Sequence, residues 1–328
     1  MSPAAAPNVL VVTLGSTTGW ASSARELTDS FARAGAHVRL VGTVPRRSVR
    51  TFMLTDYSQA RAARRTVLRA LAQQPADAVV YCSITAALLW PRPGAIWLDS
   101  LAAENRPGRH GVWQRRVERR RLTAAPLVLT MADSSLDSMP VADRPSAVTV
   151  PVPVAPSGPA AATRDVDVLA YAGDPVKRRL DLILAAWDRA RRDGETLVVT
   201  GTDQAGAPPG VRFTGRLAPD AYRELVRRAR VFVAAPRRED FGIAPLEALA
   251  DGCVLVTTPA PGPYPALTLA RELDPRLVGE DLACALRIAL DDPRSGYAER
   301  AAKLLAPFGR PSVDRTVADR VLPRLLTR

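Results

Sequence analysis

Two glutamates flank a Phe-Gly pair in residues 239–252, which read EDFGIAPLEALADG. Glu239 lies in a polar segment before the pair, and Glu247 falls in an apolar run that predicts a helix over 243–250. Gly242 directly precedes this helix. A glycine lets an anion approach the backbone closely, and the first amides of a helix attract a phosphate. Glu247 follows one turn later, so its carboxylate can accept hydrogen bonds from a vicinal diol such as the 2′- and 3′-hydroxyls of a ribose.

Glu239 is predicted on the other side of that phosphate position, where it can accept hydrogen bonds from the hydroxyls of a sugar. The order ribose, diphosphate, sugar along one edge describes a nucleotide sugar. Two carboxylates can also serve acid–base or metal chemistry, but neither glutamate has a neighbouring histidine in the sequence. We therefore interpret the stretch as a candidate nucleotide-sugar site.

The elements around this motif alternate between short apolar runs, typical of buried parallel strands, and helical patterns. The strands are predicted over 8–14, 37–42, 77–82, 95–99 and 126–131, and again over 166–173, 195–201, 211–215, 230–236 and 253–258. Between the two sets, residues 151–165 contain four prolines and are predicted to be a linker. The pattern predicts an α/β protein with two tandem Rossmann-like domains and a ligand in the cleft between them, at the carboxyl ends of the strands.

Composition limits the function classes. The chain has 328 residues, 47% of them hydrophobic, and no apolar run of about 18 residues that would span a membrane. Its three cysteines lack the spacing of metal ligands, and no secretory signal is recognisable, so we expect a cytoplasmic protein without structural zinc or disulfides. The net charge is +12, of which residues 1–155 carry +9. Arginines share one helical face at positions 61, 64, 65 and 69, and another at 115, 116, 119 and 120.

The basic first half has two interpretations beyond a solvated surface. Contact with an anionic lipid or an acidic acceptor is one. Nucleic-acid binding is the other, but the arginines lack interleaved aromatic residues and no known nucleic-acid-binding module is present, so no nucleic-acid partner is expected. The predicted loop of residues 15–23 follows the first strand, where loops carry function. Gly15, Thr18 and Trp20 in that loop are candidates for binding an acceptor.

The motif resembles the signature of retaining glycosyltransferases of the two-Rossmann (GT-B) type, family four, in which two glutamates are separated by seven residues. Further segments are similar to that family in the same order: YAGDPVKRRLDLILAAW opens the second domain, and VRFTGRLAPDAYRELVRRARVFVAAPRRED leads into the signature. The resemblance is strong over 166–258 and weak over 1–150. It implies an acceptor-binding domain over 1–155, a donor-binding domain over 156–310, and a last helix over 311–328 that packs back on the first domain.

The resemblance also implies roles for individual residues. Glu247 binds the donor ribose, and Glu239, as part of the catalytic set, binds the transferred sugar. The loop at Gly215–Leu217 touches the base. The implied donor-binding residues are Gly173, Lys177, Arg178, Leu217, Phe241, Gly242, Ile243, Ala244 and Glu247. No cofactor or metal is implied beyond the nucleotide sugar, of UDP or GDP type, as co-substrate. The leaving phosphate takes the acceptor proton on the same face of the sugar.

The sequence departs from the family pattern at two positions. Asp174 stands where family members often carry an arginine that neutralises the diphosphate, so Lys177 or Arg178 is expected to supply the charge. The family's first domain often has a histidine that contacts the sugar near the end of its fourth or fifth strand; Asp99 is the nearest candidate here and is expected, with Glu239, in the catalytic set. Two alternatives therefore stay open: an inactive relative that binds a nucleotide or sugar as a partner protein, and an enzyme that glycosylates a small natural product instead of an anionic or membrane-held acceptor.

Overall fold

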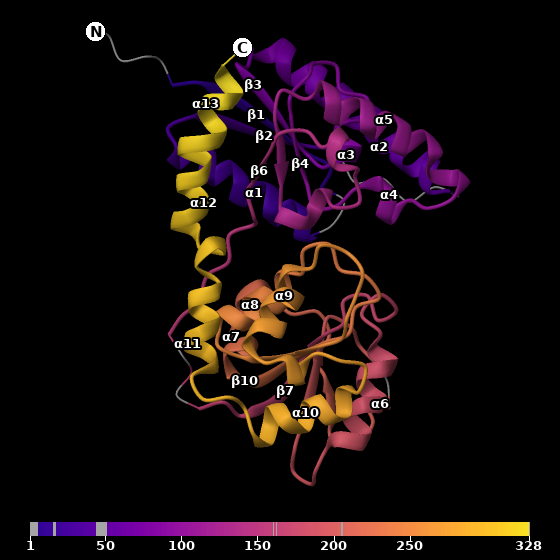
Figure 1. Ribbon diagram of the computed structural model, residues 1–328, viewed down its shortest axis with the longest axis vertical. Coiled ribbons are helices and arrows are strands. Elements are labelled where there is room, and N and C mark those ends of the chain that lie inside the picture. Colours follow the sequence, from indigo (N-terminus) through magenta and orange to yellow (C-terminus); the bar gives the residue numbers. More distant parts are fainter. Residues whose placement is uncertain are drawn as a thin grey trace. The chain divides into compact units, whose positions relative to one another are not determined.

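The computed structural model describes residues 6–15, 18–43, 51–159, 161, 163–204 and 206–327. The chain forms two compact units (Figure 1). The first unit comprises the described residues up to Pro153 together with those from Arg310 onward, and the second unit comprises Val154–Gly309. Each unit is built on one parallel sheet with helices packed around it, which confirms the predicted α/β fold with two Rossmann-like domains.

The first unit has a six-stranded parallel sheet in the order β2-β1-β3-β4-β5-β6. Its strands are β1 (Asn8–Thr13), β2 (His37–Gly42), β3 (Ala78–Cys82), β4 (Ala95–Leu98), β5 (Val128–Thr130) and β6 (Ala147–Thr149). Its helices include α1 (Thr18–Arg33), α2 (Phe52–Gln73), α3 (Ile84–Ala87), α4 (Ala102–Asn105) and α5 (Val112–Ala124). Strands β1, β3, β4 and β5 form because their valines, leucines and isoleucines are buried on both faces, whereas the edge strand β2 is only partly buried. Strand β6 was not predicted.

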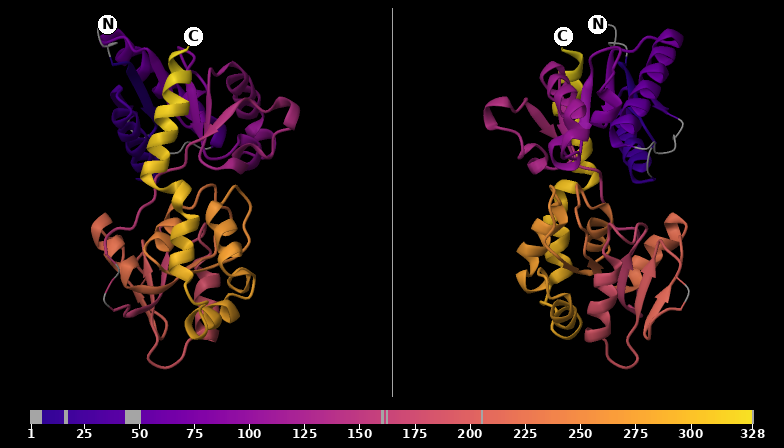
Figure 2. Two further views of the ribbon diagram at one scale, coloured as in Figure 1. Left: turned by 60° about the vertical axis from the view of Figure 1, so that its left-hand side comes forward. Right: turned by 90° about the vertical axis from the view of Figure 1, so that its right-hand side faces the viewer.

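The C-terminal segment belongs to the first unit. It consists of α12 (Arg310–Thr316), the π-helical turn η6 (Val317–Val321) and α13 (Leu322–Leu326). Asp314 accepts a hydrogen bond from Arg33 of α1 at 2.6 Å, and Arg310 pairs with Glu26 of the same helix. The views in Figure 2 show this segment, in yellow, along the first unit. The contacts follow from the apolar face that Val313, Val317 and Val321 bury.

The second unit has a five-stranded parallel sheet in the order β11-β10-β7-β8-β9. The strands are β7 (Val166–Tyr171), β8 (Leu197–Thr200), β9 (Val211–Phe213), β10 (Ala229–Ala234) and β11 (Val254–Thr257). The helices are α6 (Leu180–Ala190), α7 (Pro219–Arg228), α8 (Ile243–Ala250), α9 (Pro265–Leu273), α10 (Leu282–Asp291) and α11 (Tyr297–Leu304). The strand order reverses between β7 and β10, and ligands of such sheets bind outside the carboxyl ends of the strands at this switch point.

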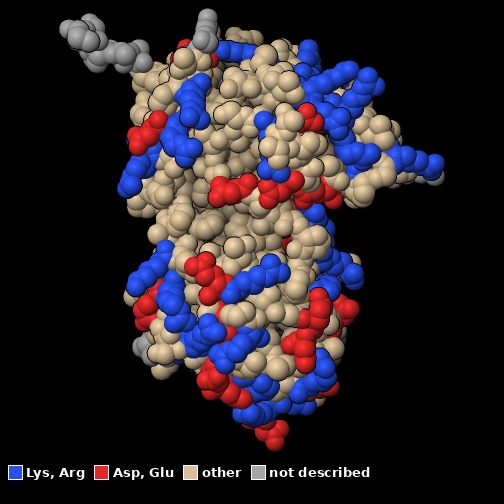
Figure 3. Space-filling model, viewed as in Figure 1, with Lys and Arg blue, Asp and Glu red and all other residues tan. Residues whose placement is uncertain are grey.

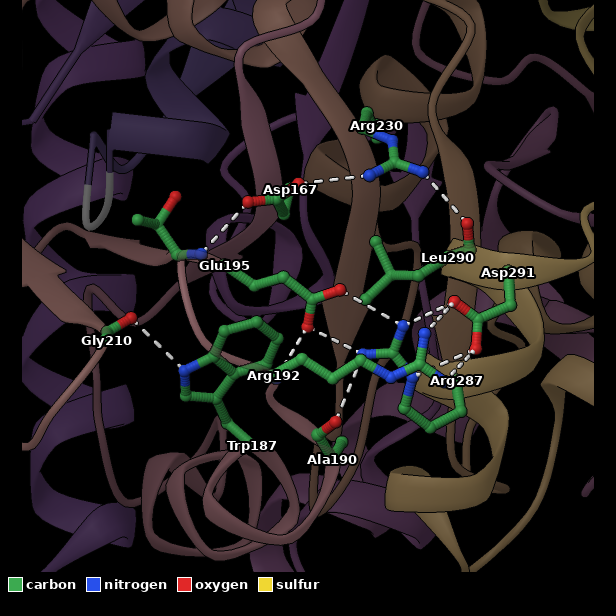
Figure 4. A network of polar contacts seen from close by, with 11 residues as sticks. Asp167, Trp187, Ala190, Arg192, Glu195, Gly210, Arg230, Arg287, Leu290 and Asp291 are labelled. Carbon is green, nitrogen blue, oxygen red and sulfur yellow. Dashed lines mark hydrogen bonds and ion pairs between the residues drawn. The ribbon is translucent and has the colours of Figure 1, made fainter.

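A polar network joins helix α10 to the segment after α6 in the second unit (Figure 4). Arg287 pairs with both Glu195 and Asp291 at 2.6 Å, and Arg192 pairs with Asp291 at 2.9 Å. The Trp187 side chain of α6 donates to the Gly210 carbonyl at 3.2 Å. These contacts join α10 to the segment after α6, and both Arg192 and Arg287 are engaged in ion pairs.

The segment predicted as a linker contains the boundary between the two units, which falls between Pro153 and Val154. Its first residues are packed: Val152 and Val154 are buried, and the Val154 amide donates to the Phe308 carbonyl at 2.9 Å. Further along, the Ser157 amide donates to Asp251 at 2.7 Å. Pro151 and Pro153 hold the start of the segment extended, and an extended chain can bury alternate valines.

Candidate functional site

The loop after β7 begins with a tight turn. A Cβ on Gly173 would lie 2.3 Å from the Tyr171 hydroxyl oxygen, so a larger residue would have to displace this ring. Asp174 accepts a hydrogen bond from the Lys177 amide at 3.0 Å, and the Lys177 ammonium lies 3.9 Å from its carboxylate. Asp174, at the position where the family often has arginine, therefore shapes the turn that presents the basic residues after it.

Two of those basic residues have different surroundings. Arg179 adopts a left-handed conformation (φ 46°) and donates to the Ala235 carbonyl at 2.9 Å and to the Thr258 hydroxyl at 2.8 Å. It ties the loop after β7 to the ends of β10 and β11, so its charge is engaged within the fold. The Arg178 guanidinium forms an ion pair with Glu239 and lies 5.9 Å from the centre of the Tyr171 ring. The structure thus brings together two predicted site residues from either side of the switch point.

The loop after β10 packs against the loop that contains Pro261 and Gly262. The Glu239 amide donates to the Pro261 carbonyl at 3.1 Å. A Cβ on Gly262, whose φ is 109°, would lie 2.2 Å from the Glu239 carbonyl oxygen. The backbone of Glu239 therefore rests on a glycine that no larger residue can replace. Sequence reasoning missed this support, although the Pro-Gly-Pro run of residues 261–263 signals a turn.

Gly242 starts helix α8, as predicted. Its φ is 79°, and a Cβ there would lie 2.9 Å from the Tyr264 ring and 3.1 Å from the Glu239 side chain. The amides of Ile243 and Ala244 belong to the first turn, where backbone amides have no intrahelical partner. The Phe241 side chain is buried and its ring centre lies 6.2 Å from that of Phe308, so only its backbone is available to a ligand.

Glu247 points from α8 toward helix α7, where its carboxylate lies 3.3 Å from the Arg223 guanidinium. Burial raises the pKa of Glu247, Arg223 opposes that rise, and nearby Asp251 adds to it. About a quarter of the side chain remains accessible, with an exposed fraction of 28%. Sequence reasoning placed Glu247 one turn from Gly242 but missed Arg223, because nothing in the spacing of α7 and α8 shows which side chains meet.

The loop after β9 also lies at the carboxyl ends of the strands of the second sheet. Gly215 has a φ of 65°, its carbonyl accepts from the Gly201 amide at 2.8 Å, and a Cβ on it would lie 2.5 Å from the Asp203 carboxylate. Leu217, two residues later, is half-buried just before α7. Both predicted residues of this loop thus lie at the same edge of the sheet as Gly173.

The candidates of the first unit lie after its strands. Gly15 follows β1 with a φ of 59°, and Asp99 follows β4, where its carboxylate accepts from the Ser100 amide at 2.8 Å. Thr18 and Trp20 lie in the first turn of α1, which corrects the prediction of a loop over 15–23. Trp20 packs edge-on against Trp97 of β4, with ring centres 6.0 Å apart. The helix begins early because this contact buries an aromatic face.

Within the described ranges, no group of three or more His, Cys, Asp and Glu side chains could hold a metal ion. None of the helices in the same ranges is long and apolar enough to cross a membrane.

Comparison with known proteins now adds to this geometry. Residues 166–292 match the model of a family described as glycosyl transferases group 1. The match supports a glycosyltransferase. The matched segment contains β7, the Arg178–Glu239 pair, Gly242 and Glu247. No curated protein shows significant sequence similarity to the chain.

Solved structures of glycosyltransferases share the fold along nearly the whole chain. WaaG, a glycosyltransferase involved in lipopolysaccharide biosynthesis, is 16% identical with a TM-score of 0.71, covering 96% of this chain and 99% of that one. The sucrose-phosphate synthase of Thermosynechococcus elongatus is 15% identical with a TM-score of 0.63, covering 94% and 96%. The glycotransferase of kitacinnamycin is 17% identical with a TM-score of 0.61, covering 98% and 100%. At these identities the likeness establishes the GT-B fold.

Proposed function

We propose that this glycosyltransferase is a retaining enzyme that moves a sugar from a nucleoside-diphosphate sugar, of UDP or GDP type, to an acceptor hydroxyl. The observation that carries the proposal is the pairing of Arg178 with Glu239 at the switch point of the second sheet, beside the first turn of α8. A cation, first-turn helix amides and two carboxylates lie near this edge of the second sheet, and these groups suit a diphosphate flanked by two sugars.

The donor is bound by the second unit. Arg178 and Lys177, with the amides of Ile243 and Ala244, stabilise the negative charge of the diphosphate, and each charge-assisted hydrogen bond contributes about 1.5–3 kcal/mol. Glu239 accepts hydrogen bonds from the transferred sugar, and Glu247 from the ribose. When the diphosphate replaces Glu239 as the partner of Arg178, the glutamate becomes available to the sugar.

Catalysis then consists of positioning and charge stabilisation. The bond between the anomeric carbon and the diphosphate oxygen breaks, the acceptor oxygen bonds to that carbon on the same face, and the departing phosphate takes the acceptor proton. Arginine, lysine and helix amides supply the positive charge, so we propose a reaction that requires neither a metal ion nor a cofactor beyond the nucleotide sugar.

The acceptor is assigned to the first unit, to the carboxyl edge of its sheet. Asp99 after β4 and Gly15 after β1 lie at that edge, and Thr18 and Trp20 follow in α1. Asp99 is proposed to contact the acceptor or the transferred sugar. A small natural-product acceptor and a nucleotide-binding relative without turnover remain the alternatives, and turnover assays separate them from the proposal.

An anionic, membrane-held acceptor is favoured by the face formed by α2 and α5, where Figure 3 shows basic side chains gathered at the upper right. The only acidic residues of these helices, Asp56 and Glu118, are buried. Within the described part of the chain, none of the exposed arginines of this face forms an ion pair: they are Arg61, Arg64, Arg65, Arg69, Arg116, Arg119 and Arg120. In the second unit, by contrast, many arginines are paired, as Arg192 and Arg287 are.

Apolar side chains accompany these charges. Phe52 and Val112 are 68% and 53% exposed, and the Tyr57 and Trp113 rings, 5.8 Å apart, join the two helices. A hollow of about 730 Å³ along α5 is lined by Val112, Arg115, Arg116, Arg119, Arg120, Thr123 and Ala124. Exposed apolar residues beside unpaired arginines suit the surface of an anionic bilayer. We propose a cytoplasmic enzyme that contacts the inner membrane face peripherally.

The donor site is tested by calorimetric titration with UDP and GDP. We expect one of them to bind in the micromolar range, and Glu247→Ala to weaken that binding by about 1.5 kcal/mol or more, which is over tenfold. Glu224→Ala, on the neighbouring helix α7, is the matched control and is expected to bind as the wild type does. If a folded sample bound no nucleoside diphosphate, the donor-site assignment would be wrong. If one nucleoside diphosphate binds, its base determines which nucleotide sugars are used as donors in the turnover assay.

The basic face is tested by flotation with vesicles of phosphatidylglycerol and phosphatidylcholine. Replacing Arg61, Arg116 and Arg119 together by glutamine is expected to lower binding about 100-fold, since each basic residue near such a surface is worth about 1 kcal/mol. The same replacement at Arg189, Arg271 and Arg300 of the second unit should change it little. If both triple variants lost vesicle binding equally, or if the wild type did not bind the vesicles, the proposal of a membrane-held acceptor would be wrong. A soluble acceptor would then be the remaining proposal.

A further inference from the structure

Arg223 of helix α7 lies between the carboxylates of Glu247 on helix α8 and of Asp251, the residue directly after that helix. Its guanidinium is 3.3 Å from Glu247 and 3.0 Å from Asp251, and it also donates to the Ala155 carbonyl at 2.8 Å. Only 15% of the Arg223 side chain is exposed. Because Asp251 follows Glu247 by four residues, at the end of the helix, both side chains reach the same guanidinium. One largely buried cation is thus paired with both acids.

The two acids differ in what else they contact. The Asp251 side chain is fully buried, and its oxygens also accept from the Ser157 amide at 2.7 Å and from the Ser157 hydroxyl at 3.0 Å. Glu247 remains partly exposed, and among the described residues its carboxylate contacts Arg223 alone. A carboxylate has about four acceptor positions. Asp251 is therefore a structural anchor, whereas Glu247 keeps acceptor capacity for a ligand.

A buried hydroxyl beside Glu247 points to that ligand. Within the described residues, the Tyr222 hydroxyl is buried without a hydrogen-bond partner. Burial raises the pKa of Tyr222, and the hydroxyl lies close enough to Glu247 that the glutamate charge adds to this rise. The Tyr222 ring meets Tyr171 edge-on, with ring centres 6.0 Å apart, and Tyr171 in turn lies over Gly173 at the switch point. An unsatisfied hydroxyl next to a carboxylate suits a group that both donates and accepts, which is what a ligand hydroxyl does.

We propose that Arg223 is a positioning residue of the donor site, which holds the Glu247 carboxylate in one orientation so that it accepts hydrogen bonds from the hydroxyls of the nucleotide's ribose. The proposal rests on the proposed function, since it assigns Glu247 to the donor. Arg223 does not touch the reacting atoms. It acts through Glu247, and its effect is therefore confined to ligands that carry the ribose hydroxyls.

Arg223 also influences the pKa of Glu247. The pKa of Glu247 is raised by burial and by Asp251, and Arg223 is the group that lowers it. Removing the guanidinium leaves only the two influences that raise the pKa. Glu247 then takes up its proton at a higher pH, and a protonated carboxyl group loses an acceptor position. Ribose recognition in an Arg223 variant should consequently weaken at a higher pH than in the wild type.

The test compares UDP or GDP, whichever binds the wild type, with its 2′,3′-dideoxy counterpart by calorimetry from pH 5.5 to 8.5. In Arg223→Met we expect affinity for the ribonucleotide to fall about tenfold or more while affinity for the 2′,3′-dideoxynucleotide changes less than twofold. The loss of ribonucleotide binding on acidification should also begin at higher pH. Arg223→Lys should recover part of the preference for ribose. Arg227→Met is the matched control, because Arg227 lies on the same helix and, within the described residues, donates to Ser157 alone.

Methionine at position 223 leaves Asp251 buried with less compensation, so the double variant Arg223→Met, Asp251→Asn is measured alongside and each fold is checked by thermal denaturation. Equal weakening of both nucleotides, with an unchanged pH profile, would show a merely structural role and overturn the inference. If Glu247→Gln kept the wild-type preference for ribose, the assignment of Glu247 itself would fail. If Glu247→Gln abolished the preference and Arg223→Met preserved it, the proposed function would stand and the role of Arg223 would not.

Discussion

Glu118 is a buried acid whose protonation should control the stability of the first unit. It lies on α5 with an exposed fraction of 4%, and its two carboxylate oxygens accept from the Ala102 amide at 3.0 and 2.9 Å. Ala102 is the first residue of α4, three residues after Asp99. Glu118 therefore caps the helix that follows the candidate acceptor residue. The change we consider is Glu118→Gln, which keeps the shape and one acceptor oxygen but cannot ionise.

The magnitude follows from the pKa. Burial raises the pKa of Glu118 from 4.5 to about 7, and the charge of Glu104 adds to that rise. Between these two values the folded chain holds the proton and the unfolded chain does not. The stability contributed by the protonated group is thus fully present below pH 4.5 and is lost as the pH rises through 7. The free energy of unfolding should fall by about 1.4 kcal/mol per pH unit in that window, or roughly 3 kcal/mol in total.

The assay is urea unfolding at pH 5, 6, 7 and 8, followed by tryptophan fluorescence. Trp20, Trp90, Trp97 and Trp113 lie in the first unit, so four of the five tryptophans report on it. Glu118→Gln should flatten the decline with pH, so that the variant is the more stable protein at pH 8. Glu224→Gln in the second unit should keep the wild-type slope. Parallel slopes for the wild type and Glu118→Gln would refute the reasoning, because they would mean that Glu118 is already ionised throughout the window.

Three further outcomes are expected at the second unit. Glu239→Ala should lower the rate of sugar transfer about 10- to 100-fold, which corresponds to the loss of one or two charge-assisted hydrogen bonds. Binding of the nucleoside diphosphate, measured by calorimetry, should stay equal or strengthen, because Arg178 loses its ion-pair partner and is available to the diphosphate. A loss of nucleotide binding that parallels the loss of transfer would contradict this prediction. Gly242→Ala, at a φ of 79°, should lower the stability measured by thermal denaturation by about 1–3 kcal/mol, and an unchanged melting temperature would show that the loop relaxes freely. Gly262→Ala should displace the Glu239 backbone and reduce transfer more than it reduces the melting temperature, and full transfer activity would argue against that support.

The sequence predicted the fold well because its signals are local. Apolar runs of four to six residues between helical patterns indicate parallel strands, and glycines such as Gly242 mark positions that other residues cannot adopt. The failures are also local. The short strand β6 lies between Pro145 and Pro151, and prolines signal turns and loops. The stretch that begins at Pro151 has the composition of a linker, which does not reveal that tertiary contacts bury Val152 and Val154.

The candidate site was predictable only one element at a time. The seven-residue spacing of the two glutamates identified both carboxylates, but their partners come from elsewhere in the chain. Arg178 and Glu239 are 61 residues apart, and only the strand order that places β7 beside β10 brings them together. Arg223 carried no sequence signal, because an arginine on an amphipathic helix normally faces water. Contacts between elements depend on packing, which periodicity does not encode.

The return of the last segment to the first unit makes the second unit an insertion within a discontinuous domain. The stretch Val154–Gly309 is continuous, whereas the first unit draws on both ends of the described chain. During synthesis the ribosome releases the residues up to Pro153 well before Arg310 exists, so Arg33 and Glu26 of α1 lack Asp314 and Arg310 as partners until the whole second unit has been made. Domains generally fold as units while the chain emerges. The connectivity therefore sets the order of folding: the second unit can fold first, and the first unit is completed when α12 and α13 are made.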